Sequence, residues 1–284
     1  MKPFLFALSL LSPAALACDA FHVPLSGTAT VETCSPNSDA DCVYSERAVY
    51  EYIEAVPDPE EAYTIGLPSS PWRLYDGQMR ILLPEELADT IRSELGGKVE
   101  RVELIGSWTG VAPAPGLPSL AERVSKALDG FPVKGEDGFL WLTAQGARRT
   151  TRQAFTARQG AGSYFLPKGA EVFVSLAVGW PLYVEDMSPD DPELAMRAAV
   201  GHDVFSLCPD KALAGFERAA GKGSAIAAYN AAMMRLERNE DGDRVAALAL
   251  LQRGAELGDA KSRERLDVER KQGTAGHRDG GTHR

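Results

Sequence analysis

One serine lies where nucleophilic chemistry could take place. Ser107 follows a predicted strand in the segment 106–110, and His202 with Asp203 could supply a general base and an acid that orients it. A nucleophile elbow needs the spacing Gly-x-Ser-x-Gly and a helix directly afterwards. Here the serine follows the first glycine directly, and a loop rich in proline comes next. The pattern favours a structural turn, so we predict no catalytic residue and no enzyme; a hydrolase that uses Ser107 is the alternative.

Two short acidic clusters, 39–41 and 239–243, invite comparison with calcium loops. Such loops need ligands at fixed alternating positions and a closing glutamate, and neither cluster supplies the full set. No spacing of cysteine and histidine fits a zinc site either. We therefore expect two turns, the second of them between helices, with no metal and no cofactor.

The overall charge excludes one class of function and leaves a basic patch. Forty acidic and 30 basic residues give a formal net charge of −10, and phosphate neutralisation in nucleic-acid binding needs clustered lysines and arginines. Nucleic acid is therefore not an expected partner. A patch of arginines could meet an acidic envelope polymer, although a solvated hairpin face is the favoured interpretation. The patch comprises Arg148, Arg149, Arg152 and Arg158.

The first 17 residues have the pattern of a secretory signal peptide. Lys2 precedes the apolar stretch 4–11, and Ala15 and Ala17 form an A-x-A cleavage site before Cys18. The stretch is shorter than the ~20 apolar residues that span a membrane, and no later segment is long enough. We expect a periplasmic or secreted protein. A lipid anchor on Cys18 is the alternative, although the preceding residues resemble a lipobox only loosely.

Four cysteines remain after the predicted cleavage, an even number that indicates disulfides in an oxidising compartment. Three connectivities are possible. Cys34 and Cys42 bracket a short polar loop and form the favoured local pair. Cys18 would then join Cys208 and tie the mature N-terminus to the start of the last helical region. Lipidation of Cys18 would leave Cys208 unpaired.

Residues 18–209 read as an α+β domain in which strands and helices alternate. Helices are predicted at 84–95, where Pro84 opens the first turn, and at 119–128, where Ser119 and Glu122 form a capping box. Strands are predicted at 79–83, 99–105 and 139–143, with further β-type segments at 172–178 and around Phe155. Residues 45–55 form either a helix capped by Ser45 or an exposed strand, and prolines make the following stretch, up to Pro71, a loop.

Aromatic residues in these strands are expected to lie in the core. A small-ligand or glycan platform built on them is the alternative. These residues are Phe139, Trp141, Phe155, Tyr164, Phe165, Phe173, Trp180 and Tyr183.

After Asp210 only helical periodicity remains, and the segment repeats itself. Residues 212–225 align with 247–260 at an offset of 35 residues, with seven identities in fourteen positions. A period near 35 predicts helix-turn-helix repeats. The C-terminal end is rich in glycine and polar residues, and we expect it to be disordered.

The segment resembles the Sel-one-like repeats, a family related to the tetratricopeptide repeats. Residues 227–231 match the first helix, 241–243 the loop, 246–248 the start of the second helix, and 254–260 its end. Met233-Met234 departs from the family pattern, and the usual Gly-x-Gly is missing from the loop. The residues expected to define the module are Tyr229, Asn230, Leu248, Leu251 and Gly258.

The resemblance implies a scaffold for protein–protein contact, and it covers about a fifth of the chain. So few repeats cannot bury their own faces, so we expect the helices to dock on the α+β domain. The predicted organisation is a signal peptide (1–17), an α+β domain (18–209), a helical repeat module (210–268) and a disordered tail (269–284). The predicted function is an exported interaction or adaptor protein whose partner is another envelope protein.

Overall fold

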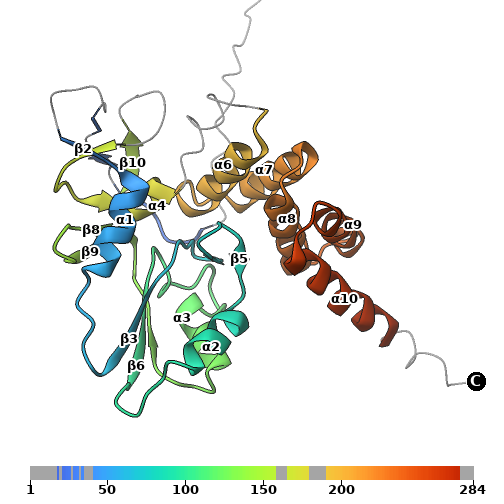
Figure 1. Ribbon diagram of the computed structural model, residues 1–284, viewed down its shortest axis with the longest axis horizontal. Helices are drawn as coiled ribbons and strands as arrows, with labels where there is room; N and C mark the ends of the chain where they lie inside the picture. The colour runs from blue at the N-terminus through green and yellow to red at the C-terminus, as the bar shows by residue number, and fades with distance from the viewer. Residues whose placement is uncertain are drawn as a thin grey trace, which may run out of the picture.

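The computed structural model describes residues 18, 21–26, 28–31, 33–34, 41–157, 165–178 and 190–275. An α/β region comes first and a run of helices follows it (Figure 1), which confirms the predicted fold class. The predicted signal peptide lies outside the described residues.

A parallel three-stranded sheet forms the centre of the α/β region. Its strand order is β3 (Ala62–Gly66), β6 (Arg101–Ile105) and β7 (Val133–Lys134). β6 pairs in parallel with both neighbours, and its pairing with β3 extends over the full length of both strands. The crossovers that parallel pairing requires contain α2 (Pro84–Arg92) and α3 (Leu120–Ala127). The two helices pack on each other at the lower end of the region in Figure 1.

Both helices and the middle strand were predicted, but the outer strands of this sheet were not. The predicted strand 79–83 is reduced to β5 (Ile81–Leu82), which forms a small hairpin with β4 (Leu74–Tyr75). The strand β3 instead occupies part of the stretch predicted as a loop, because the prolines there bound the strand rather than exclude it. Ser119 and Glu122 form the predicted capping box.

A second sheet has the order β12 (Val172–Phe173), β8 (Phe139–Leu142) and β9 (Arg148–Thr151), with antiparallel pairs. The prediction of a β segment at 172–178 is confirmed for the first two residues, which form β12. It is wrong for the rest, because the chain continues as the helix α4 (Val174–Val178). Periodicity cannot separate a short buried strand from a buried helix, and the ends of α4 are buried at Val174 and Val178.

The remaining elements of the α/β region are short. Residues 45–54 form the helix α1 (Ser45–Glu54), but Tyr44 rather than Ser45 occupies its cap position. The other strands pair as β1 (Thr28–Val31) with β10 (Ala154–Ala157), and as β2 (Cys42–Tyr44) with β11 (Phe165–Pro167).

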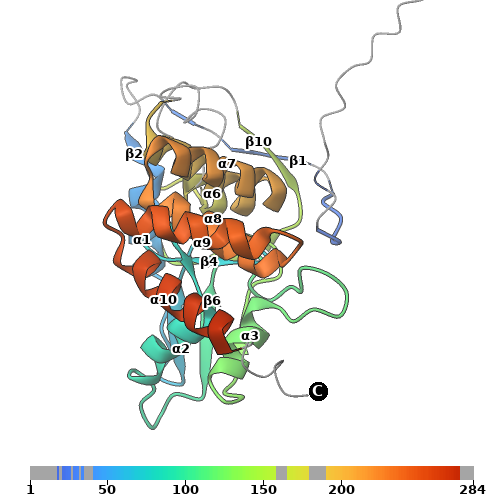
Figure 2. The same cartoon turned by 90° about the vertical axis from the view of Figure 1, so that its right-hand side faces the viewer.

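Consecutive helices that pack on one another form the C-terminal part. They are α6 (Pro192–Val204), α7 (Pro209–Lys222), α8 (Ala225–Arg238), α9 (Asp243–Glu256) and α10 (Ala260–Ala275). The helical run therefore begins with α6, before Asp210. Figure 2 shows this run lying across one side of the α/β region.

The predicted boundary at residue 269 needs a correction. Helix α10 continues past residue 269 to Ala275. Glu269 is buried and forms ion pairs with Arg244 at 2.8 Å and with Arg265 at 2.7 Å, and these contacts hold this part of the helix in place. The rest of the predicted tail, 276–284, lies outside the described residues.

Both preferred cysteine pairs lie at disulfide distance. The Cα atoms are 5.2 Å apart in Cys18–Cys208 and 6.2 Å apart in Cys34–Cys42. The first pair ties residue 18 to the start of α7.

The loop between α8 and α9 is built around the buried carboxylate of Asp243. Arg235 and Arg238 donate hydrogen bonds to it, and so does the backbone N–H of Glu240. The hydrogen bonds from Arg238 and then Arg235 hold the pKa of Asp243 well below its ordinary value. The acidic cluster 239–243 is thus an inter-helix loop, as predicted.

Acid is expected to weaken this loop in a defined pH range. Because the folded-state pKa is depressed, the stabilisation is complete above the ordinary aspartate pKa of about 3.9 and is lost as the pH falls below it. The free energy of unfolding of the wild type should fall between pH 5 and pH 3 as this stabilisation is lost. We expect a smaller fall in Asp243→Asn, which lacks the carboxylate, and urea denaturation at several pH values measures it. Asp241→Asn, at an exposed position of the same loop, is the control. An unchanged pH profile in Asp243→Asn would refute the assignment.

Candidate functional site

The β4–β5 hairpin joins the two parts of the molecule. Leu74 belongs to the apolar core of α2, α3 and β6, whereas Tyr75, Met79 and Ile81 belong to the core of the C-terminal helices. We call the contact of this hairpin (residues 74–82) with α6, α8 and α10 the seam. The helices therefore dock on the α/β domain, as the small number of repeats predicted.

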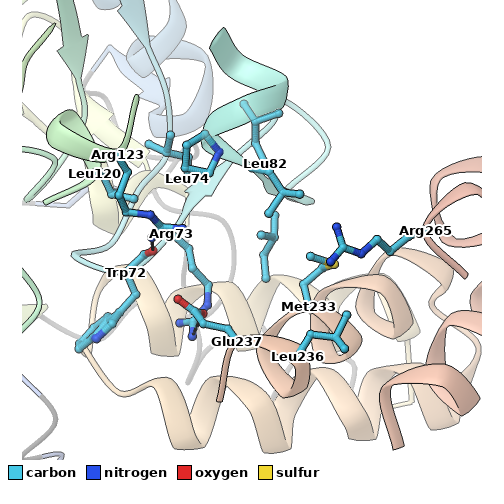
Figure 3. A pocket seen from close by; sticks show the side chains of 13 residues that line it. Trp72, Arg73, Leu74, Leu82, Leu120, Arg123, Met233, Leu236, Glu237 and Arg265 are labelled. Carbon is cyan, nitrogen blue, oxygen red and sulfur yellow. Dashed lines mark hydrogen bonds and ion pairs between the residues drawn. The ribbon is translucent and has the colours of Figure 1, made fainter. Parts of the chain in front are cut away.

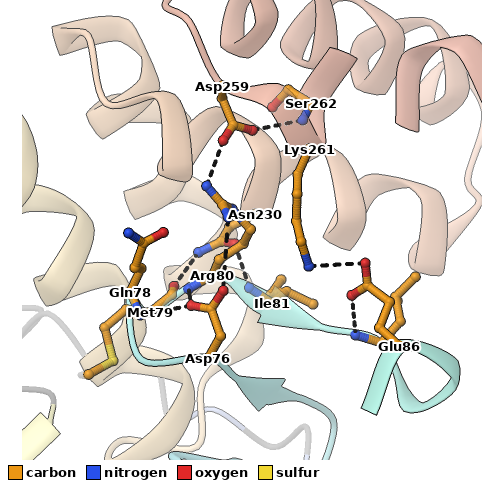
Figure 4. A network of polar contacts seen from close by, with 11 residues as sticks. Asp76, Gln78, Met79, Arg80, Ile81, Glu86, Asn230, Asp259, Lys261 and Ser262 are labelled. Carbon is orange, nitrogen blue, oxygen red and sulfur yellow. Dashed lines mark hydrogen bonds and ion pairs between the residues drawn. The ribbon is translucent and has the colours of Figure 1, made fainter. Parts of the chain in front are cut away.

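Polar contacts fix the hairpin on α8 and α10 (Figure 4). The side-chain amide of Asn230, fully buried in α8, donates to the carbonyl of Met79 at 2.9 Å and accepts from the backbone N–H of Ile81 at 2.8 Å. Arg80 reaches Asp259 at the start of α10 at 2.5 Å. One amide thus satisfies two backbone groups of the hairpin, and the register between hairpin and helix is set.

A second buried cluster centres on Asp203 of α6. Its carboxylate is fully buried and accepts hydrogen bonds from Ser70 at 2.6 Å, Arg73 at 2.9 Å and Tyr75 at 2.8 Å. Arg73 also contacts Glu237 of α8 at 2.7 Å. Burial opposes the charge of Arg73, but the carboxylates of Asp203 and Glu237 outweigh it and raise the pKa of Arg73. Burial, followed by the charge of Asp203, raises the pKa of Tyr75, so the phenol is a neutral donor.

A cavity of about 210 Å³ opens along the seam beside these clusters. We call it the seam groove (Figure 3). Its walls come from both parts of the molecule. The α/β wall includes Trp72, Arg73, Leu82, Leu120 and Arg123, and the helical wall includes Met233, Leu236, Glu237 and Arg265.

The groove combines apolar walls with guanidinium groups. Arg123 of α3 donates from Nη1 to the carbonyl of Trp72 at 2.9 Å. Arg265 of α10 lies beside Met233 in Figure 3, and Glu237 is turned toward Arg73. Such a site can hold an apolar side chain and a neighbouring anion together.

The structure does not bring Ser107 together with His202 and Asp203. The buried Ser107 hydroxyl accepts from the backbone N–H of Leu140 at 3.0 Å and from the hydroxyl of Ser175 at 2.8 Å. Within the described ranges, these are the partners of its side chain, and Asp203 belongs to the cluster above. Ser107 therefore joins β6 to β8 and α4 as a structural residue.

The arginine patch is paired with carboxylates. Arg149 reaches Glu171 at 2.7 Å and lies over the ring of Trp141, and Arg152 is 3.5 Å from Asp137. Arg148 pairs with two further carboxylates, those of Glu103 and Glu136. Arg158 lies outside the described residues. The described part of the patch is a hairpin face whose arginines are paired with carboxylates.

Of the aromatic residues whose side chains the structure describes, Phe139, Trp141 and Phe173 form core, as predicted, whereas Phe165 does not. Phe139, Trp141 and Phe173 are buried against one another. Phe165 is half-buried beside Tyr44. The side chains of Phe155, Tyr164, Trp180 and Tyr183 lie outside the described residues.

The residues that carry the repeat resemblance lie at helix contacts and at a turn. Tyr229 and Leu251 are buried in the helical core, and Leu248 packs against it. Burial raises the pKa of Tyr229 to about 12. Gly258 has φ +95° just after α9, a left-handed conformation that glycine adopts without strain. Assignment to the repeat family itself remains a prediction.

Sequence reasoning missed the groove. Its key residues are scattered along the chain: Trp72 and Arg73 directly follow the proline-rich stretch, Arg123 lies in a predicted helix, and Arg265 lies near the C-terminus. A weak signal was Met233, one of the positions that depart from the repeat pattern. In the part of the chain that the structure describes, no group of three potential metal ligands occurs, and no helix is long and apolar enough to cross a membrane.

The comparisons with known proteins reach only part of this site. Residues 38–150 match a family described as a domain of unknown function, DUF8616. The match includes the parallel sheet and α3, and thus Trp72 and Arg123, but it ends before the C-terminal helices. No curated protein matches the chain, and no solved structure matches it.

Proposed function

We propose that this protein is exported and that it binds a partner polypeptide, another envelope protein, in the seam groove. The observation that carries the proposal is that the two walls belong to different parts of the molecule and yet are fixed to each other. Asn230 and Asp203 hold the hairpin to α8 and α6 by buried hydrogen bonds. A preformed groove lowers the ordering cost of binding, which favours affinity.

The size of the groove favours a polypeptide over a small molecule. Its volume of about 210 Å³ is below the range of roughly 300–1,000 Å³ that is usual for small-molecule sites. It suits one or two anchoring side chains, and hot spots of protein interfaces are pockets of this kind, enriched in tryptophan and arginine. Arg123 supplies an arginine at the α/β wall, and Trp72 lines the same wall with its ring edge-on to Phe21 at 5.8 Å.

Two further observations support the proposal. Cysteine pairs at disulfide distance are typical of an oxidising compartment, in agreement with the signal-peptide pattern. The consecutive antiparallel packing of α7 to α10 is also what helix-turn-helix repeats require, and the repeats that the segment resembles act in protein contact.

Photo-crosslinking in intact cells tests the proposal. We expect a benzophenone amino acid that replaces Trp72, half-buried in the groove wall, to capture one envelope protein. The same amino acid in place of Tyr50, 43% exposed on α1, is the matched control and should not capture it. Leu236→Glu should abolish the capture from position 72. Equal capture from both positions, or none from position 72, would contradict the proposal.

Point variants are preferable to truncation here. Removing the chain after Asp210 would expose Tyr75, Met79 and Ile81, which share a core with the helices. A truncated protein would therefore lose binding through misfolding as easily as through loss of the groove.

A further inference from the structure

We propose that the occupant of the seam groove is an acidic peptide segment. In it, the carboxylate of an aspartate or glutamate binds Arg123, and an adjacent leucine-like side chain enters the cavity. This inference rests on the proposed function and names the chemistry of the partner.

The charge of Arg123 is the first reason to expect an acidic partner. The carboxylates of the buried cluster already neutralise Arg73, and Glu269 lies 2.7 Å from Arg265. Arg123, in contrast, has no carboxylate within ion-pair distance in the described part of the chain, and its one hydrogen bond there goes to the Trp72 carbonyl. The half-exposed Arg123 is therefore the guanidinium of this wall whose charge is open to an incoming anion.

The orientation of the Arg123 guanidinium is the second reason, because it favours a carboxylate as the bound anion. Its Nη1 is held by the Trp72 carbonyl at 2.9 Å. Nε and Nη2 have no acceptor among the described residues, and two such N–H groups match the two oxygens of a carboxylate. A fixed guanidinium also loses little side-chain freedom on binding.

The apolar walls of the groove indicate that the occupant also carries an apolar side chain. Leu82 and Leu120 lie on one side of the groove and Met233 and Leu236 on the other, as Figure 3 shows. Methionine adapts its shape to an incoming side chain. A lone anion would leave these walls exposed to water, so the best occupant carries an apolar side chain beside its carboxylate.

The net charge of −10 does not oppose this occupant at short range. Charges farther away than about 8 Å are largely screened at physiological ionic strength. The repulsion from the whole chain acts mainly at low salt, whereas the contact with Arg123 acts at the site. The proposal therefore depends on one local guanidinium rather than on the overall field.

Selection from a phage-displayed library of random heptapeptides tests the inference on the full mature chain. We expect the wild type to enrich peptides with an aspartate or glutamate beside a leucine-like residue. A synthetic peptide from that pool should bind Arg123→Ala about 10–100-fold more weakly by fluorescence anisotropy. Arg123→Glu should enrich lysine or arginine at the acidic position instead.

Matched controls separate recognition from folding. Arg152→Glu makes the same charge change at an exposed arginine outside the groove and should bind like the wild type. Circular dichroism and the denaturation midpoint confirm that each variant is folded. Enrichment of neutral or basic peptides, equal binding by Arg123→Ala, or no enrichment at all would overturn the inference.

The test also separates this inference from the proposed function. If position 72 captures a partner in cells but acidic peptides are not enriched, the groove binds a polypeptide of other chemistry and only this inference fails. If neither result appears, the proposed function fails as well. Binding of octanoate that depends on Arg123, with no peptide enriched, would overturn the inference in favour of a small carboxylate ligand.

Discussion

Replacing Asp203 with alanine is expected to lower the free energy of unfolding by about 3–5 kcal/mol, the range for removing one partner of a buried ion pair. The carboxylate is fully buried and has three hydrogen-bond donors. Without it, the buried hydroxyls of Ser70 and Tyr75 lose their acceptor, and Arg73 keeps only Glu237. Urea denaturation at pH 7, followed by circular dichroism, measures the change.

Two further variants identify the cause of this loss. Asp203→Asn keeps the shape and one oxygen acceptor, so we expect it to be less destabilising than alanine. Glu60→Ala removes one partner of the exposed pair with Lys98, whose side chains are 80% and 79% exposed, and should cost about 0–1 kcal/mol. A loss below about 1 kcal/mol in Asp203→Ala would show that the buried cluster does not hold the seam.

Local signals predicted the elements that depend on local chemistry. The capping box at Ser119 and the proline that opens α2 act within one helical turn, so the sequence alone reveals them. The outer strands of the parallel sheet were missed because β3 is only five residues long and lies between prolines. Its strand character depends on pairing with β6, which is distant in the chain.

The groove could not be predicted for a similar reason. Arg123 and Met233 are ordinary residues of two amphipathic helices, and nothing in their spacing places them on facing walls. Their juxtaposition depends on how the hairpin docks on α8. The small number of repeats predicted that docking takes place, but the geometry of the docking is set by buried polar groups such as Asn230.

Asn230 carries the second large expected effect because its amide serves two backbone groups at once. The N–H of Ile81 and the carbonyl of Met79 lie in the hairpin between the two parts of the molecule, and Met79 has φ +62°, a conformation that few non-glycine residues adopt. A buried backbone group without a partner costs about 1–3 kcal/mol. The amide therefore stabilises both the turn and its position on α8.

Asn230→Ala is expected to lower the free energy of unfolding by about 2–6 kcal/mol, the sum for two unsatisfied backbone groups. Gln252→Ala, which removes an amide with two exposed hydrogen bonds, one to Glu256 and one from Arg270, is the control and should change stability by less than about 0.5 kcal/mol. Urea denaturation measures both. Because Asn230 fixes the distance between the groove walls, crosslinking from position 72 should fall in the same variant under conditions where it remains folded. A variant as stable as Gln252→Ala would mean that apolar contacts alone hold the hairpin on α8.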